Sequence, residues 1–288
     1  MTMTRIYLSM LLALTGLVLT TPAKAALTLS YPTVTHTIPA AVGSTPGGDL
    51  MDISCPSGTK VVSGGWTTSS GAAPHIMVWV SRQIGNGWRI MTLNQSSSAL
   101  TITGTAICAG GLSLTTYFTS VGVNVPGFSG LGASVPCSSG GIPTGGGFDS
   151  NFPNPGILIP VLSYPTFQNQ WNSTEYNSTN TTRAFTAFVT CMKNVSATVT
   201  PVFGNWVTFQ NGLSQEAFVE CNPGDFAIGG GYATSVTSSN LPFAYQRVRT
   251  MRNGPTATNS RRWTVRAHNA NQADWASIRP VAQCLHIN

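Results

Sequence analysis

The chain has 288 residues, and only 8% of them are charged, with 14 Lys and Arg against 8 Asp and Glu. Soluble domains usually carry about 25% charged residues. The 42% hydrophobic content of this chain is enough to build a core and excludes disorder driven by charge. Beyond the N-terminus, no apolar run approaches the roughly 18–20 residues that a helix needs to cross a bilayer, so the composition predicts no transmembrane segment there.

Residues 1–25 have the three-part layout of a secretory signal peptide. Arg5 precedes an apolar stretch from Ile6 to Leu19, and Ala23-Lys24-Ala25 matches a cleavage site of a form typical of bacteria. Without this segment, 12 of the 14 basic residues remain against the 8 acidic ones, which gives a net charge of +4. We therefore expect a secreted or cell-surface protein, with the periplasm as an alternative. We expect no binding to nucleic acid, because this charge is too weak.

A cysteine motif then occurs three times. Cys55, Cys137 and Cys221 each open the pattern C-x2-G-x4-[SG]-G-G-aromatic. The pattern ends at one aromatic residue in each copy: Trp66, Phe148 and Tyr232. We expect the glycines to serve a β-bulge or a tight turn, where a Cβ would clash.

A second set of columns follows each copy of the motif. Trp88, Trp171 and Trp263 are each followed six residues later by Asn, and 20 or 21 residues later by another cysteine. Columns that recur together in three copies indicate an internal triplication. The chain therefore divides into a signal peptide at 1–25 and three β repeats at 26–110, 111–193 and 194–288.

The six cysteines favour disulfides over metal or redox chemistry, because their number is even and the chain is predicted to be exported. Pairing within each repeat would join Cys55 to Cys108, Cys137 to Cys191 and Cys221 to Cys284, and would close loops of 53, 54 and 63 residues. Loop-closure entropy makes each such bond worth about 4 kcal/mol. Pairing between neighbouring repeats is the alternative.

Strand patterns dominate the repeats, and no long window repeats apolar residues at helical spacing. In the first repeat, Ile76–Val80 leads to Asn86-Gly87 and then to Trp88–Leu93, which predicts a hairpin turning at Asn-Gly. Residues 157–162 and 243–251 fill the same slot in the other repeats. We therefore predict an all-β fold of three tandem, disulfide-stapled repeats of short antiparallel strands, each a small β-sandwich-like unit, with little or no helix. The repeats pack either as beads or around a pseudo-threefold axis, and their length of roughly 80–90 residues favours beads or packed sandwiches.

The three recurring tryptophans have two interpretations. As core residues, Trp88, Trp171 and Trp263 would each bury about 150–250 Å² beside a disulfide. As an aromatic platform, they would stack on sugars while the following Asn residues supply hydrogen bonds. We favour the core, because a residue required in every copy more often specifies the fold than a ligand.

The third repeat departs from the other two. It has 42 residues between its first cysteine and its tryptophan, against 33 and 34 in the others, and the extra residues fall in a predicted hairpin, Tyr245–Arg266, that contains no acid. The candidate anion-binding or glycan-binding residues there are Arg247, Arg249, Arg252, Arg261, Arg262 and Arg266. Guanidinium groups suit the sulfate, phosphate or carboxylate groups of an acidic polysaccharide. The alternative is a solvated, charged edge that prevents aggregation.

Motifs for catalysis, metal binding and cofactor binding are missing. There is no G-x-S-x-G sequence, no cluster of His and Cys at metal-ligand spacing, and none of the eight carboxylates falls in a repeated column. We therefore expect no catalytic residue, metal or cofactor, and predict a non-enzymatic binding protein, adhesin-like or lectin-like, with glycans or acidic polysaccharide as partners. One alternative is a structural subunit that self-associates into an extracellular fibre, pilus or matrix, and a second is a secreted hydrolase.

Overall fold

The computed structural model describes residues 27–43, 45–69, 75–111, 114–150, 158–195, 197–237, 248–256, 258–270 and 275–287. The predicted signal peptide and Arg247 lie outside these ranges. Within them, every regular element is a β-strand, and no helix long and apolar enough to cross a membrane is found. The predicted all-β fold is confirmed.

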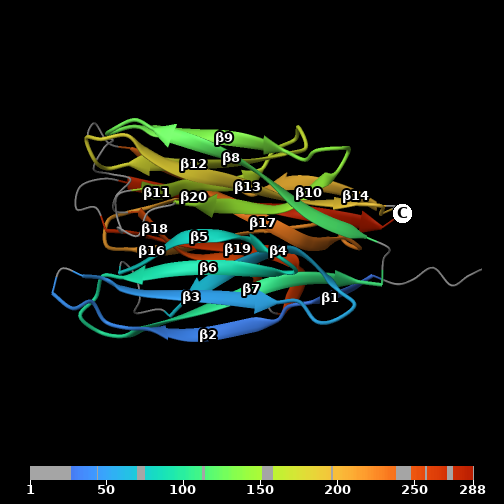
Figure 1. The fold of residues 1–288 in the computed structure, drawn as a ribbon, viewed down its shortest axis with the longest axis horizontal. Helices are drawn as coiled ribbons and strands as arrows, with labels where there is room; N and C mark the ends of the chain where they lie inside the picture. The colour runs from blue at the N-terminus through green and yellow to red at the C-terminus, as the bar shows by residue number, and fades with distance from the viewer. Residues whose placement is uncertain are drawn as a thin grey trace, which may run out of the picture.

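The three repeats follow one order of strands, except that the first strand of the second repeat takes the place of two strands in each of the others. Figure 1 shows how the strands are arranged. The first repeat contains β1 (Thr28–Ser30), β2 (Thr33–Ile38), β3 (Gly47–Ser54), β4 (Lys60–Thr68), β5 (Ile76–Ile84), β6 (Gly87–Asn94) and β7 (Leu100–Gly110). The second contains β8 (Thr115–Val125), β9 (Gly130–Pro136), β10 (Ile142–Asp149), β11 (Leu158–Pro165), β12 (Gln170–Asn177) and β13 (Arg183–Lys193). The third contains β14 (Ala197–Phe203), β15 (Val207–Phe209), β16 (Ser214–Glu220), β17 (Phe226–Thr237), β18 (Val248–Thr256), β19 (Asn259–Asn269) and β20 (Trp275–Ile287).

Each of the three antiparallel sheets combines strands from two repeats. Sheet I has the order β1-β7-β4-β18-β19-β16, with β2 also paired to β7, and joins the first repeat to the third. Sheet II, β3-β6-β5-β10-β13-β8, joins the first to the second, and sheet III, β14-β20-β17-β11-β12-β9 with β15 also on β20, joins the second to the third. Each repeat is therefore paired with both others in a closed ring. The expectation of separate beads is wrong, and the repeats surround a pseudo-threefold axis.

The glycine motif explains why the ring can close. A Cβ added to Gly65, Gly147 or Gly231 would lie only 2.1, 1.7 or 1.8 Å from a backbone carbonyl oxygen of the neighbouring repeat's strand. A side chain at this column would therefore push β4 from β18, β10 from β5, or β17 from β11. A β-bulge precedes the glycines in each of β4, β10 and β17, so the predicted bulge is also found.

The aromatic residues that end the motif meet where the repeats converge. The ring centroid of Trp66 lies 6.5 Å from that of Phe148 and 6.2 Å from that of Tyr232, and both pairs of rings are nearly perpendicular. Edge-to-face pairs of this kind are favourable beyond the area that they bury. All three side chains are buried, so one residue from each repeat contributes to a shared core.

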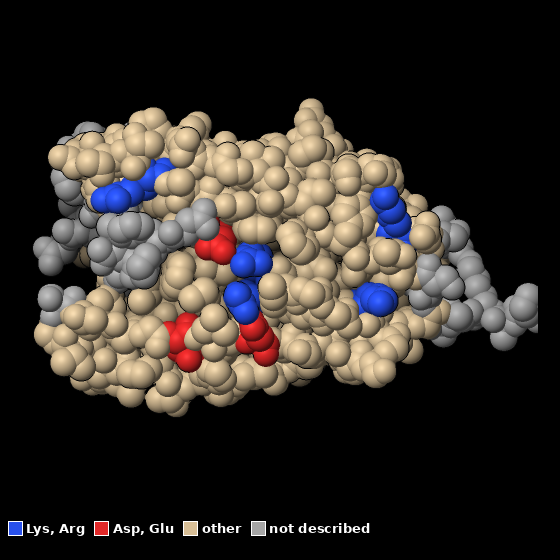
Figure 2. Space-filling model, in the orientation of Figure 1, with Lys and Arg blue, Asp and Glu red and all other residues tan. Residues whose placement is uncertain are grey.

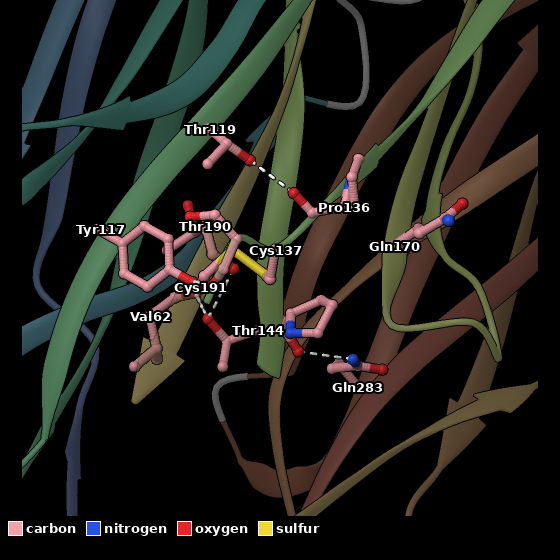
Figure 3. Close-up of a disulfide and its surroundings, with 12 residues drawn as sticks. Val62, Tyr117, Thr119, Pro136, Cys137, Thr144, Gln170, Thr190, Cys191 and Gln283 are labelled. Carbon is pink, nitrogen blue, oxygen red and sulfur yellow. Dashed lines mark hydrogen bonds between the residues drawn. A yellow bond between two sulfur atoms is a disulfide. The ribbon is translucent and has the colours of Figure 1, made fainter. Parts of the chain in front are cut away.

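The disulfides form within each repeat, as predicted. They are Cys55–Cys108, Cys137–Cys191 and Cys221–Cys284, and they fit an oxidising compartment. Figure 3 shows the second disulfide beside Thr144, whose hydroxyl donates to the carbonyl of Val62 at 2.7 Å. Nearby, the Gln283 amide donates to the carbonyl of Pro143, also at 2.7 Å. Hydrogen bonds thus link all three repeats close to this disulfide.

The predicted hairpin in the first repeat forms, but its turn lies one residue earlier than expected. Ile84 pairs with Gly87, so the two turn residues are Gly85 and Asn86, and the positive φ of 51° falls on Gly85. The Asn86 side chain accepts a hydrogen bond from the backbone N–H of Val61 at 3.0 Å. This bond ties the turn to β4, which explains why Asn stands second in the turn.

Candidate functional site

The recurring tryptophans lie in the core. Trp88, Trp171 and Trp263 are 0%, 1% and 0% exposed. Their indole N–H groups donate to a polar side chain on the adjacent strand in each repeat: Ser81 at 3.0 Å, Ser163 at 2.9 Å and Asn253 at 2.9 Å. A buried indole that is hydrogen-bonded internally offers no face to a sugar.

The asparagines that follow the tryptophans are also internal. Asn94 and Asn177 are fully buried. The side-chain amide of Asn94 donates to the carbonyls of Ile38, Pro39 and Ser98, and that of Asn177 donates in the same way to three backbone carbonyls of its own repeat. The amides therefore fix loops, and the hydrogen bonds imagined for a sugar are already used.

The arginine-rich hairpin is β18 and β19, and acids from the neighbouring strand β16 contact it. Arg252 lies 3.5 Å from Glu216, while Arg261 and Arg262 lie 3.8 and 2.5 Å from Glu220. Sequence analysis found no acid in the hairpin itself and missed these partners, because they precede it in the chain. Much of the expected positive face is thereby neutralised.

The remaining arginines of this set are placed differently. Arg266 stands opposite Glu216 and Arg252 in the register of the sheet. Arg249, at the start of β18, has a buried guanidinium nitrogen, Nη1, instead of a solvated one. The five candidates that lie within the described residues therefore do not form one accessible anion-binding surface, and Arg247 lies outside those residues.

A different surface, on sheet III, gathers aromatic side chains around one arginine. We call it the Arg279 cluster: Tyr164, Phe167, Phe203, Trp206 and Arg279. The ring of Phe203 lies 5.9 Å from that of Tyr164 and 5.0 Å from that of Phe167. The guanidinium carbon of Arg279 lies 4.7 Å from the centroid of Phe203 and 6.0 Å from that of Trp206.

The cluster is assembled across the junction between the second and third repeats. Tyr164 lies on β11, and Phe167 lies in the turn that follows it. Phe203 ends β14, Trp206 lies between β14 and β15, and Arg279 is on β20, the strand that both of these pair with. Because β11 pairs with β17 in the same sheet, these segments meet although they are distant in sequence.

Local hydrogen bonds hold the arginine in place. Arg279 Nε donates to the carbonyl of Gly204 at 2.9 Å, and the N–H of Gly204 donates to the carbonyl of Pro280, also at 2.9 Å. A Cβ on Gly204 would approach the Pro280 ring to 2.7 Å, so glycine permits this close contact. No carboxylate within the described ranges forms an ion pair with Arg279.

Two members of the cluster are well exposed. Phe167 is 74% exposed and Trp206 is 46% exposed, and Arg279 lies half-buried between the rings. Large aromatic side chains exposed to water beside an arginine are a common feature of binding surfaces. Sequence reasoning missed the cluster. The one signal was that Arg279 occupies a column filled by Thr103 and Thr186 in the other repeats.

Sheet II carries charges that are paired. Arg82 Nε lies 3.0 Å from Asp149, and Arg89 lies 2.7 Å from Asp52. The hydrogen bond from Arg89 lowers the pKa of Asp52 below its ordinary value. Figure 2 shows how sparse charge is on one face of the molecule, with basic and acidic groups adjoining near its centre.

One carboxylate is deeply buried. Glu175 on β12 is 0% exposed, and burial raises its pKa to about 8. Ser150 donates a hydrogen bond to Glu175 Oε1 at 2.9 Å. Raised pKa values are typical of general acids, but a group that no substrate can reach cannot act as one. Glu175 is therefore a neutral core residue at pH 7.

Comparisons with known proteins add no assignment. No family model matches the chain, and a search of curated proteins finds no match. Among the described residues, no three His, Cys, Asp or Glu side chains converge so as to hold a metal ion.

Proposed function

We propose that this protein is a secreted, non-enzymatic glycan-binding protein, and that it binds anionic glycans at the Arg279 cluster. The observation that carries the proposal is a guanidinium held beside exposed aromatic rings, with no ion-pair partner among the described residues. Secretion rests on the predicted signal peptide, and three disulfides are in line with it.

The chemistry of the cluster matches an acidic sugar. Aromatic faces pack against the C–H surface of a sugar ring, and Phe167 and Trp206 offer such faces to solvent. A guanidinium forms strong, directed hydrogen bonds with carboxylate or sulfate oxygens. Nε of Arg279 is engaged by Gly204, which leaves the terminal nitrogens for a ligand.

The cluster is not required by the fold, which supports a binding role. The position of Arg279 holds threonine in the first two repeats, and the position of Phe203 holds Thr33 and Ser120. Two repeats thus form the same strands without these side chains. A feature present in only one of three copies is free to serve a ligand.

Binding of the mature protein to an array of sulfated, carboxylated and neutral glycans tests the proposal. We expect retention of acidic glycans, and we expect Trp206→Ala and Phe167→Ala each to weaken it by roughly twofold to tenfold, since exposed cation–π and stacking contacts are worth about 0.5–1.5 kcal/mol. The matched control is Phe118→Ala on β8 of sheet II, which removes another aromatic residue that is 44% exposed. Equal losses in the control and cluster variants, or no acidic glycan retained, would contradict the proposal.

A further inference from the structure

A small cavity of about 20 Å³ lies beside the aromatic residues shared by the three repeats. The first residues of β5, β11 and β18, one strand from each repeat, line it together with Trp66 and Tyr232. The cavity therefore lies where the three repeats meet. None of the residues that line it belongs to the Arg279 cluster.

Arg249 is the one charged residue among the described residues that line this cavity. Its equivalents in the register of the other repeats are Met77 and Ile159, because these stand opposite Leu93 and Tyr176 as Arg249 stands opposite His268. Both equivalents are buried apolar side chains. The third repeat thus places a cation where the other two place hydrocarbon.

Among the described residues, Nη1 of the Arg249 guanidinium has no partner. This nitrogen is buried and makes no hydrogen bond, and no ion pair to Arg249 is formed within the described residues. Burial lowers the pKa of Arg249 to about 10, so the group keeps its proton at neutral pH. His268, opposite it, is bonded to Ser214 and supplies no negative charge.

We propose that this cavity binds one small inorganic anion, of the size of chloride, against the Arg249 guanidinium. A buried N–H without a hydrogen-bond partner is unfavourable, and Nη1 of the half-buried Arg249 is such a group. Trp66, which also lines the cavity, already donates its Nε1–H to the Thr250 carbonyl at 3.4 Å. The volume of about 20 Å³ suits one water-sized particle. A monatomic anion such as chloride is small enough for this space.

Thermal unfolding of the mature protein in chloride and in gluconate, at equal ionic strength, tests the proposal. Gluconate is too large for the cavity, and an anion that binds only the folded state raises Tm. We expect Tm to be higher in chloride by about 2–4 °C. In Arg249→Met, which installs the residue found at Met77, we expect the additional rise of Tm in chloride over gluconate to be lost.

General salt effects on stability act on both proteins, so the difference between them isolates the site. A second measurement needs no variant: crystals of the mature protein grown in bromide should show an anomalous peak beside Arg249. The same response to chloride in the parent and in Arg249→Met, or a bromide crystal without this peak, would overturn the proposal. Because Arg249 is outside the Arg279 cluster, neither result depends on glycan binding.

Discussion

Sheets II and III are built alike, but their outer faces differ. The comparison shows how an arginine with a structural role in sheet II differs from the arginine that we propose for binding in sheet III. Each sheet joins two repeats, and each places an arginine over a phenylalanine: Arg82 over Phe188 at 5.0 Å and Arg279 over Phe203 at 4.7 Å. Arg82 also bonds to Asp149 at 3.0 Å, whereas Arg279 lacks a carboxylate partner among the described residues. The arginine of this cation–π contact is therefore neutralised by a carboxylate in sheet II, whereas in sheet III no described carboxylate neutralises it.

The neighbouring residues extend this contrast. In sheet II the arginines Arg82 and Arg89 face the aspartates Asp149 and Asp52, so the row is neutral. In sheet III the position of Asp149 is taken by Ala233, directly opposite Arg279, and exposed aromatic rings replace the charges. We infer that a change of a few residues on equivalent strands is enough to turn a surface with internally paired charges into a candidate binding surface.

The largest expected effect tests whether the three sheets, including sheets II and III, are held by one packed core. Replacing Trp88, Trp171 or Trp263 by Ala should lower the free energy of unfolding by about 3–5 kcal/mol each, because every one fills a sealed core position. Denaturant titration of the mature protein measures it. The control is Trp206→Ala, a tryptophan 46% exposed in the Arg279 cluster, for which we expect a loss within about 1 kcal/mol. Similar losses for buried and exposed tryptophans would refute this assignment.

A second prediction concerns position 175 in sheet III, where sheet II has Thr92. The folded-state pKa of Glu175 is raised to about 8 from its ordinary value of 4.5. Between these pH values the unfolded chain loses a proton that the folded protein keeps, so stability should fall as pH rises through this window, by up to about 1.4 kcal/mol per pH unit. Below pH 4.5 the group is neutral in both states and has no effect.

The variant Glu175→Gln, whose side chain cannot ionise, isolates the effect of Glu175 ionisation on stability. It removes the ionisation and leaves an oxygen for the Ser150 hydroxyl. We expect Tm at pH 8 to be higher in the variant than in the parent, and the two values to converge at pH 4. Parallel pH profiles for both proteins would show that Glu175 does not titrate as its burial requires.

A third prediction converts sheet III to the pattern of sheet II. Ala233→Asp places a carboxylate opposite Arg279, at the position that Asp149 occupies in the second repeat. The arginine should then pair internally, and binding of acidic glycans should weaken by roughly tenfold or more, since charge-assisted bonds are worth about 1.5–3 kcal/mol. Isothermal titration with a sulfated glycan measures the loss.

Ala233→Asn is the matched control, because it has the same shape without the charge. We expect it to bind nearly as the parent does. If both substitutions weaken binding equally, crowding at residue 233 is the cause, and the charge of Arg279 is not needed.

What could be predicted from the sequence depends on the range of the interactions. The strands and the disulfides follow from local alternation and from cysteines that recur in register, so both were predictable. The joining of repeats depends on pairings such as β4 with β18, which lie far apart in the chain. Gly65, Gly147 and Gly231 were its signal, since they pack against the neighbouring repeat's carbonyl groups, but their columns were interpreted as features within one repeat.

The site residues show the same limit. The arginine-rich hairpin was found because its residues are close in sequence, but Glu216 and Glu220, which neutralise it, lie on another strand. The Arg279 cluster draws its side chains from separate segments of two repeats, so no window of the sequence contains it. Comparison of the repeat columns was the available route, because Arg279 replaces a threonine there.

The smallest expected effect concerns the paired charges of sheet II. Asp52 bonds to Arg89 through both carboxylate oxygens, at 2.8 and 2.7 Å, but its side chain is 42% exposed. Exposed ion pairs are worth about 0–1 kcal/mol because water and salt screen them, so Asp52→Asn should lower the free energy of unfolding by no more than that at pH 7. The Asp52 pKa is lowered in the folded state, so this contribution is present above the pKa of the unfolded carboxyl and is lost as pH falls through the folded one. Chemical unfolding at low and high salt measures the difference, which should shrink when salt is added. A loss well above about 1 kcal/mol that salt does not reduce would mean that the Asp52–Arg89 pair is needed for the stability of the fold. The paired charges of sheet II could then not be treated as a surface without a structural role when they are compared with the Arg279 cluster.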